Sequence, residues 1–289
     1  MEIKILTDQE RAKLPGEFVK LSQGWVHYEL TGPENGPVVV LVHGFATPLF
    51  VWDHLVPALK EAKFRVLRYD LFGRGFSDRP RIKNNEDLFD SQLLELTNAL
   101  GIEQPFHIVG LSMGGAISSI FAARHPEKIL SLTLIAPAGY PVKIPMAAKL
   151  VRTPLLGEIL MSLFGNKIII NSVTKDFYNQ NQNFVSEYTI KFKEQMAYEG
   201  FRRSILSTLR HFNLNDQSAS YTALGSQNQK VLLIWGLNDG VVPYENSKKI
   251  LAALPNARLH SIDQAGHLVH FETPEKVNPV IVEFLKDCI

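Results

Sequence analysis

The sequence predicts an α/β fold, a mostly parallel sheet of about eight strands that is flanked by helices and interrupted by a helical insert. Apolar, β-branched runs alternate with amphipathic segments before residue 139 and again after residue 226. Between residues 140 and 225 this alternation stops, and only helical spacing remains. Strands that alternate with helices are typical of a parallel sheet covered on both faces. We therefore expect a core domain of residues 1–139 and 226–289, with residues 140–225 as a helical cap.

The first four predicted strands lie in the N-terminal part of the chain. Residues 17–21 and 25–30 are two short strands joined by a turn. Residues 37–43 are almost wholly apolar and β-branched, which indicates a strand buried on both faces. Residues 65–70 form a similar strand, which runs into the glycine-rich segment 71–77.

Two further strand–helix units follow. Residues 87–100 place apolar side chains three or four positions apart, which predicts a helix, and Gly101 ends it. Residues 106–109 are a buried strand, residues 113–124 a helix rich in small side chains, and residues 130–136 another strand.

The insert is helical, basic and aromatic. Apolar residues recur every three or four positions over residues 184–196 and 201–212, which predicts two amphipathic helices. Residues 140–225 contain six Lys and four Arg against two Asp and four Glu, together with six Phe and five Tyr. The aromatic side chains could line a pocket for a hydrophobic or anionic ligand, or they could pack the small core of the cap itself.

The strand–helix alternation returns after the insert. Residues 230–235 and 257–262 read as strands, and residues 244–254 as a helix. A final helix spans residues 274–286 and begins at a proline, which is favourable at the first helical position.

The composition excludes several classes of protein. The net charge of +1 gives no field that would indicate nucleic acid or acidic partners. The single cysteine, Cys288, excludes an intramolecular disulfide and a two-cysteine metal site. No secretory signal is visible at the start, and no apolar run approaches the ~18–20 residues of a membrane span. We therefore expect a soluble cytoplasmic protein.

The most informative motif is Gly110-Leu111-Ser112-Met113-Gly114. It lies between a predicted buried strand and a helix rich in small residues, which is the setting of a G-x-S-x-G nucleophile elbow. A side chain at position 110 or 114 would collide with its neighbours in so sharp a turn, so glycine is favoured at both. The motif therefore predicts that Ser112 has a strained backbone and a hydroxyl projecting above the sheet.

A nucleophilic serine needs a base, usually a histidine held by a carboxylate. Asp239 and His267 each follow a predicted strand, at the sheet edge where open α/β folds place their sites. We expect the loops to bring them to Ser112. Asp263 is a rival for the acid but lies very near His267 in the chain, and Asp216 lies within the insert.

The chain resembles the α/β-hydrolase superfamily, in its capped serine-hydrolase branch. The segments that carry the resemblance span nearly the whole chain outside the cap: residues 43–45, 70–78, 110–115, 236–243 and 266–267. The resemblance implies that Ser112 is the nucleophile, that His267 is the general base and then acid, and that Asp239 orients His267. It also implies an oxyanion hole formed by the backbone N–H groups of Phe45 and Met113.

By the same resemblance, His43 is a structural histidine, and the glycine-rich loop at residues 73–75 is structural and borders the site. Four side chains are candidates to line the substrate pocket, although each could equally belong to the core: Phe50, Trp52, Trp235 and Val241. The histidines are scattered without a metal-binding pattern, so we expect no metal.

We expect a cofactor-independent serine hydrolase that cleaves a small-molecule carboxylic ester through an acyl-enzyme on Ser112. A serine at the elbow differs from the aspartate of epoxide hydrolases and haloalkane dehalogenases in this superfamily. The same triad could also serve a lipid or monoacylglycerol hydrolase, an amidase, or a carbon–carbon hydrolase of vinylogous diketones.

Two further alternatives stay open. One is a small-molecule receptor that reuses the fold, which labelling of Ser112 by a fluorophosphonate would distinguish from an enzyme. The other is membrane contact through the apolar residues 142–164 of the cap. Here we favour a buried cap helix, because Pro145 and Pro154 interrupt any long helix.

Overall fold

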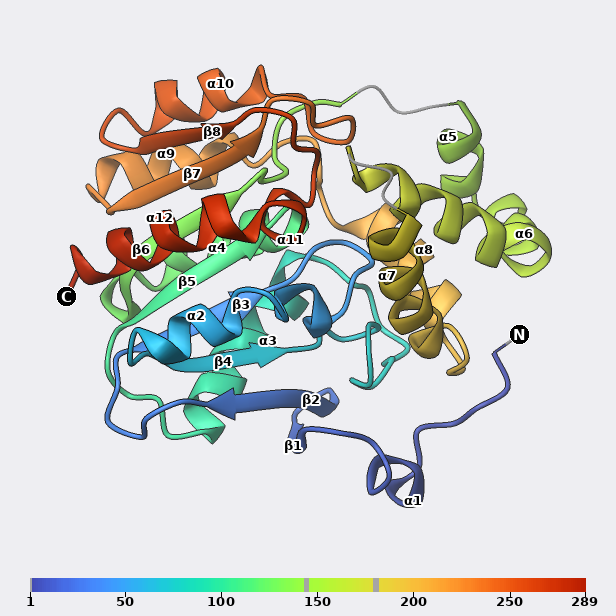
Figure 1. The fold of residues 1–289 in the computed structure, drawn as a ribbon. Coiled ribbons are helices and arrows are strands. Elements are labelled where there is room, and N and C mark those ends of the chain that lie inside the picture. The colour runs from blue at the N-terminus through green and yellow to red at the C-terminus, as the bar shows by residue number, and fades with distance from the viewer. Residues whose placement is uncertain (1, 143–145, 179–181) are drawn as a thin grey trace.

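A single sheet with strand order β1-β2-β4-β3-β5-β6-β7-β8 organises the computed structural model, which describes residues 2–142, 146–178 and 182–289 (Figure 1). The strands are β1 (Glu17–Leu21), β2 (Gly24–Thr31), β3 (Val38–Val42), β4 (Arg65–Tyr69), β5 (Phe106–Leu111), β6 (Ile129–Ile135), β7 (Val231–Gly236) and β8 (Arg258–Ile262). The β1–β2 and β2–β4 pairs are antiparallel, and all the later pairs are parallel. The predicted sheet is confirmed.

Both faces of the central strands are buried. In β3, Val40 and Val42 pack into one hydrophobic core, whereas Val39 and Leu41 pack into the core on the opposite face. Because successive side chains of a strand point to opposite faces, a continuously apolar run is needed when helices cover both. The apolar runs in the sequence therefore correspond to the two-sided burial of the sheet.

Helices cover each face of the sheet. The first core contains side chains of α3 (Glu86–Ala99), α4 (Met113–Arg124), α9 (Ser218–Ser226) and α10 (Asn246–Ala253). The second contains side chains of α2 (Val56–Glu61), α11 (Val269–Glu272) and α12 (Pro274–Lys286). A short α1 (Asp8–Arg11) precedes the sheet.

The sequence analysis did not find α2 and α9. The first has only six residues, too few for a helical period to show. In the second, Ser, Thr and Gly dominate, and only Tyr221 and Leu224 are buried. Although α9 begins within residues 140–225, it packs against α4 and α10. The division of the chain into core and cap at residues 140 and 225 stays a prediction.

We refer to four helices that Figure 1 shows grouped at one end of the sheet as the cap helices: α5 (Met146–Arg152), α6 (Leu156–Val173), α7 (Gln182–Gln195) and α8 (Phe201–His211). Pro154 separates α5 from α6, while Pro145 lies outside the described residues. In the described part of the chain, no helix combines the length and the apolar character needed to cross a membrane.

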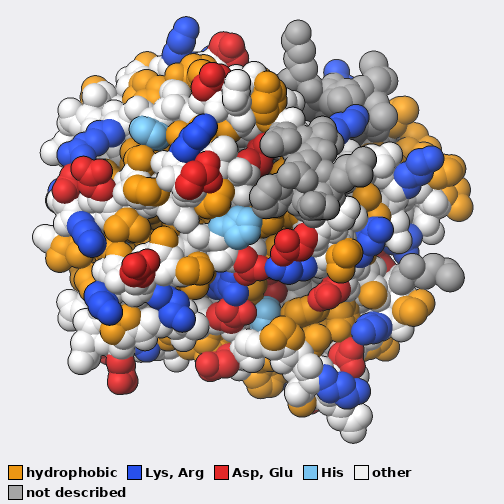
Figure 2. Space-filling view, viewed as in Figure 1, with side chains coloured by type: hydrophobic (Ala, Val, Ile, Leu, Met, Phe, Trp, Pro, Cys, Tyr) orange, Lys and Arg blue, Asp and Glu red, His pale blue; other side chains and the backbone are white. Residues whose placement is uncertain are grey.

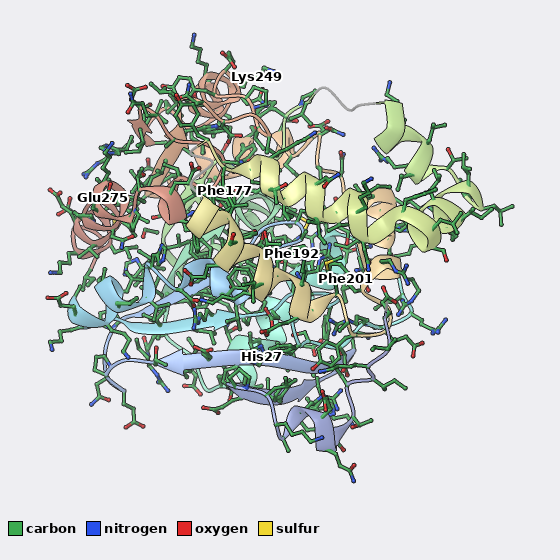
Figure 3. The ribbon with its side chains drawn as sticks, turned by 45° about the vertical axis from the view of Figure 1, so that its right-hand side comes forward. His27, Phe177, Phe192, Phe201, Lys249 and Glu275 are labelled. Carbon is green, nitrogen blue, oxygen red and sulfur yellow. The ribbon has the colours of Figure 1, made fainter. Side chains whose placement is uncertain are left out.

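Aromatic side chains of the cap pack against one another and against the core. Tyr188 and Phe192 of α7 are fully buried and stack with ring centroids 6.2 Å apart. Phe192 contacts Phe201 of α8 at 6.3 Å, and Phe177 contacts Phe271 of α11 at 6.0 Å. Figure 3 shows Phe177, Phe192 and Phe201 following one another along the cap. These rings form the core of the cap and its contact with the sheet domain.

Candidate active site

Ser112 occupies the sharp turn between β5 and α4. Its backbone has φ 54° and ψ −118°, a positive-φ conformation that is costly for a residue with a side chain. The Ser112 N–H donates to the carbonyl of Ile135 at 2.9 Å, and its own carbonyl accepts from Ala138 at 3.0 Å. These bonds to β6 and the loop after it hold the turn in its strained form.

The glycines on either side of Ser112 are sterically required. A Cβ at Gly110 would lie 2.6 Å from the carbonyl oxygen of Gly114. A Cβ at Gly114 would lie 2.1 Å from the carbonyl oxygen of Val42. Both distances are well inside contact range and involve backbone, so any larger residue would force the turn apart. This crowding is what the G-x-S-x-G spacing predicted.

His267 and Asp239 meet at the ends of neighbouring strands. His267 Nδ1 and Asp239 Oδ2 are 2.8 Å apart. The other oxygen of Asp239 accepts from the N–H groups of Val241 at 2.8 Å and Val242 at 2.9 Å, which orients the carboxylate. His267 and Ser112 line the same cavity, of about 90 Å³. The structure thus brings Ser112, His267 and Asp239 to one edge of the sheet.

The rival acids lie elsewhere. Asp263 is exposed and accepts from the neighbouring Gln264 N–H at 2.9 Å. Asp216 is exposed as well and accepts from the N–H and hydroxyl of Ser218. His267 Nδ1 pairs with Asp239 and, among the described residues, hydrogen-bonds to neither of these two carboxylates.

Two backbone N–H groups close to Ser112 have no hydrogen-bond acceptor among the described residues. Met113 is the first residue of α4, so its N–H has no acceptor within the helix. Among the described residues, neither this N–H nor that of Phe45 donates a hydrogen bond. The Phe45 carbonyl accepts from Nε of the buried Arg74 at 2.7 Å, and Arg74 Nη2 donates to Thr208 of α8 at 2.9 Å. Arg74 therefore fixes the Phe45 peptide against the cap.

Of the four side chains predicted to line the pocket, Val241 lines the cavity with Ser112. Trp52 and Trp235 are fully buried in the core. Trp52 packs on His270 with centroids 4.7 Å apart, and Trp235 Nε1 donates to the Val242 carbonyl at 3.0 Å. Large aromatic side chains bury the most apolar area, and the two tryptophans pack in the core and are not among the described residues that line the cavity.

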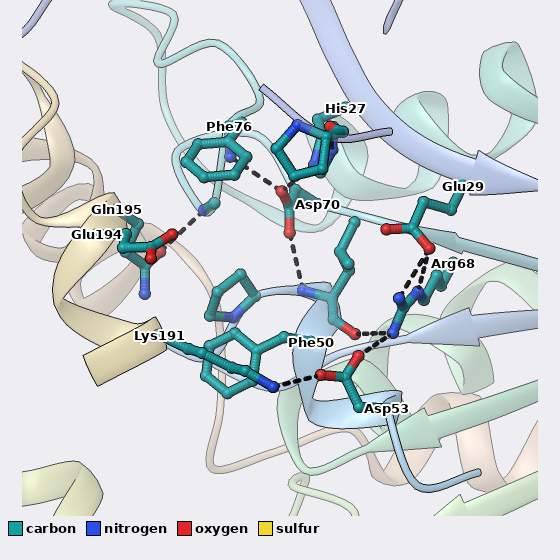
Figure 4. Close-up of a pocket in the computed structure, with 14 residues that line it drawn as sticks. His27, Glu29, Phe50, Asp53, Arg68, Asp70, Phe76, Lys191, Glu194 and Gln195 are labelled. Carbon is teal, nitrogen blue, oxygen red and sulfur yellow. Dashed lines mark hydrogen bonds and ion pairs between the residues drawn. The ribbon is translucent and has the colours of Figure 1, made fainter. Parts of the chain in front are cut away.

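Phe50 lines a different cavity, of about 270 Å³, between the sheet and α7 (Figure 4). Lys191 of α7 donates to Asp53 there at 2.9 Å. On the same wall, Asp70 pairs with His27 at 2.7 Å and accepts from the N–H of Leu49 at 2.8 Å. These paired groups hold loops in place, and the ion pair joins the cap to the core.

His43 supports the backbone beside the site. Its Nε2 accepts from the Leu71 N–H at 2.9 Å, and its Nδ1 lies 2.9 Å from the Gly44 carbonyl. Burial lowers the pKa of His43 to about 4, so the ring is neutral and can accept at Nε2. These contacts match the structural role that the sequence predicted.

Two acidic residues beside His267 were not predicted. Asp176, from the segment between α6 and α7, lines the cavity, and its carbonyl accepts from the His267 N–H at 2.9 Å. Glu272 of α11 accepts from Gly266 N–H at 3.0 Å and from Tyr178 N–H at 2.9 Å. Hydrogen bonds therefore join the loop between β8 and α11, which we call the histidine loop, to the segment between α6 and α7. The sequence carries no signal for this, since neither acid lies in a motif.

The carboxylates set the charge state of the site. Burial alone would lower the pKa of His267, but Asp239, Asp176 and Glu272 outweigh it and raise the pKa. Burial raises the pKa of Asp176 to about 7; the charge of His267 opposes the rise, and Asp239 and Glu272 add to it. Asp176 is thus an acid that changes charge near neutral pH. Among the described residues, no group of three or more His, Cys, Asp or Glu is arranged to hold a metal ion.

The raised pKa of Asp176 predicts a pH-dependent loss of stability. The folded protein keeps a proton that the unfolded chain releases near its ordinary pKa of 3.8. The contribution of this carboxyl is complete below a pH of about 3.8, falls as the pH rises from there, and is fully lost above about pH 7. We expect the free energy of unfolding of Asp176→Asn to exceed that of the wild type. The difference should grow as the pH rises from about 3.8 to about 7, to on the order of 3 kcal/mol. Urea unfolding at a series of pH values measures it.

Asp263→Asn is the matched control, because Asp263 is an exposed carboxylate on the histidine loop. Its free energy of unfolding should stay within about 0.5 kcal/mol of the wild type, as is usual for exposed substitutions. Stability curves of Asp176→Asn and the wild type that run parallel from pH 4 to pH 8 would contradict the prediction.

Comparison with known proteins places this geometry in a family. Residues 37–274 match the family model for the alpha/beta hydrolase fold. The chain therefore belongs to the alpha/beta hydrolase fold family, and we conclude that it is a hydrolase. The family that the sequence motifs indicated is confirmed.

Similar proteins cover most of the chain. It is 29% identical to the "uncharacterized hydrolase YugF" of Bacillus subtilis over 272 residues, which covers 90% of this chain and 93% of that one. It is 27% identical to the 2-hydroxy-6-oxo-6-phenylhexa-2,4-dienoate hydrolase of Comamonas testosteroni, with 92% and 93% covered. Its fold is similar to that of a thermophilic esterase from Thermogutta terrifontis, with a TM-score of 0.80, 24% identity, and 94% and 99% covered.

Proposed function

We propose that this hydrolase cleaves a neutral carboxylic ester through an acyl-enzyme on Ser112. The observation that carries the proposal is the 2.8 Å contact between His267 Nδ1 and Asp239 Oδ2, on an imidazole that shares a cavity with Ser112. With Nδ1–H donated to Asp239, Nε2 has a free lone pair and can accept the serine proton. The strained turn at Ser112 supports the same assignment.

The reaction proceeds in two acyl transfers. Ser112 Oγ attacks the ester carbonyl carbon while His267 Nε2 takes the hydroxyl proton, and the N–H groups of Phe45 and Met113 bind the oxyanion. The C–O bond to the alcohol breaks, and the proton on His267 passes to the leaving oxygen. Water then attacks the acyl-enzyme with His267 as base, which releases the acid and restores Ser112. No cofactor enters either step.

The cavity favours a substrate without negative charge. Asp176 contributes a carboxyl to its wall, and no Lys or Arg is among the described residues that line it. A carboxylate on the substrate would meet the charge of Asp176 above neutral pH, and the described residues of these walls offer no Lys or Arg to pair with it. A neutral ester avoids this repulsion, and protonated Asp176 can donate to an ester oxygen.

A carbon–carbon hydrolase is the second candidate. Its support is the sequence similarity to the Comamonas testosteroni enzyme, whose name specifies a dienoate. Such a reaction would use the same serine, histidine and aspartate on a ketone. The charge at Asp176 is what separates the two candidates.

A substrate panel tests the proposal. At pH 8 we expect kcat/KM for short p-nitrophenyl esters to exceed that for a 2-hydroxy-6-oxo-dienoate by about 100-fold or more, because like charges in a cavity cost several kcal/mol. Asp176→Asn should lower the ratio of kcat/KM for the ester to kcat/KM for the dienoate, while Asp263→Asn should leave this ratio unchanged. Faster turnover of the dienoate by the wild type would favour the carbon–carbon hydrolase, and failure of Ser112 to react with a fluorophosphonate would favour the receptor.

The cytoplasmic location stays a prediction.

A further inference from the structure

An apolar patch covers the outer face of α6. Buried residues recur every four positions, from Gly157 through Gly165 to Val173, on the face of α6 that packs against α5 and α8. The opposite face exposes large apolar side chains. We define the α6 patch by the five most exposed of these: Leu155 (80% exposed), Ile159 (56%), Leu163 (69%), Phe164 (54%) and Ile168 (42%).

This patch is unlike the rest of the described surface. Seven of the fifteen exposed large hydrophobic side chains among the described residues lie between positions 150 and 168. Single exposed apolar residues are normal on a protein, but contiguous groups of this kind mark interaction sites. The apolar stretch that the sequence analysis favoured as a buried cap helix therefore has one buried face and one open face.

Three exposed lysines lie on or beside the helix that carries the patch. Lys149, Lys167 and Lys175 are exposed on α5, on α6 and just after α6. The single acid of α6, Glu158, is paired with Arg210 of α8 at 2.9 Å, so its charge is already matched. Figure 2 shows orange and blue side chains together along the right-hand edge, where Figure 1 places α6.

We propose that α6 docks this hydrolase on a membrane surface that carries anionic lipid headgroups. An apolar helical face with basic residues at its borders inserts between headgroups, and its lysines pair with lipid phosphates. A second copy of the chain fits less well, because symmetric pairing of the patches would set lysines against lysines. No described helix can cross a bilayer, so α6 would lie in its surface.

The same helix reaches the catalytic cavity. Ser172 and Val173 at the C-terminal end of α6 line the cavity that holds Ser112 and His267. When the α6 patch contacts a membrane, the catalytic cavity therefore lies within the length of α6 from the membrane surface. The docking does not depend on which ester is cleaved.

Vesicle binding tests the proposal on the intact protein. We expect the wild type to co-sediment with phosphatidylcholine vesicles that contain phosphatidylglycerol, and more weakly with phosphatidylcholine alone. The double variant Leu163→Glu, Phe164→Glu should bind at least about ten-fold more weakly, because it removes apolar area and adds negative charge. Each of Lys149→Gln, Lys167→Gln and Lys175→Gln should weaken binding to the anionic vesicles about five-fold.

The controls separate docking from folding and catalysis. Ile289→Glu changes a side chain that is 71% exposed at the C-terminus, far from α6 in Figure 1, and should bind vesicles like the wild type. All variants should keep the wild-type melting temperature and turnover of a short soluble ester. The proposal is overturned if the wild type stays in the supernatant, or if the double variant binds as well as the wild type. It is also overturned if that variant only dissociates a dimer in light scattering.

Discussion

Replacing Ser112 by alanine is expected to lower kcat for a short p-nitrophenyl ester by about 10⁶-fold while the protein stays folded. Without the hydroxyl no acyl-enzyme can form, and only substrate binding and the oxyanion donors remain. Alanine keeps the Cβ, so the positive φ of 54° is no more strained than before. The Ser112 side chain also makes no capping hydrogen bond to α4, so the melting temperature should not change. Steady-state kinetics measure the loss of kcat, and thermal unfolding measures the melting temperature.

Ser119→Ala is the matched control on the same helix. Its buried hydroxyl donates to the carbonyl of Gly115 at 2.8 Å, and its loss should cost about 1 kcal/mol of stability with activity close to that of the wild type. Activity retained by Ser112→Ala, in protein shown by mass spectrometry to carry the substitution, would refute the assignment of the nucleophile.

Asp239→Asn is expected to lower kcat by about 10⁴-fold with little change in stability. The amide oxygen can still accept from Val241 and Val242, so the loop keeps its shape. The amide NH₂ would then face His267 Nδ1, which must become an acceptor. The ring proton moves to Nε2, and His267 can no longer take the proton of Ser112.

The pH profile gives this prediction a second readout. In the wild type, the Asp239 carboxylate helps to raise the pKa of His267. In Asp239→Asn that support is lost, so the pH below which activity falls should shift downward. Asp263→Asn, on an exposed carboxylate of the histidine loop, should change neither kcat nor the profile. A larger loss in Asp263→Asn than in Asp239→Asn would move the acid to position 263.

Local patterns in the chain predicted the sheet, several of its helices and the nucleophile turn. A strand buried on both faces needs an unbroken apolar run, and the crowding at Gly110 and Gly114 allows only glycine there. Both constraints act on neighbouring residues, so both can be recognised in the sequence. Parallel strands place their C-terminal ends at one edge, which predicted that Asp239 would meet His267. The short helices α2 and α9 have no comparable sequence pattern.

Side chains that act across the boundary between cap and core could not be predicted in this way. Asp176 meets His267 from a segment about 90 residues earlier in the chain. Glu272, close after His267, accepts from Tyr178 of that same segment, and Arg74 joins the Phe45 loop to α8. Trp52 and Trp235 have the same residue type as pocket-lining side chains, yet they are core.

The amino-acid order by itself determined the fold family and the residues proposed for catalysis, because periodicity, steric crowding and chain order act over a few neighbouring positions or along one sheet edge. Only the tertiary structure decided which carboxylates surround His267, which aromatic side chains are buried, and which face of α6 is open. Those outcomes depend on how the cap packs on the sheet, and no short stretch of sequence contains both sides of that contact.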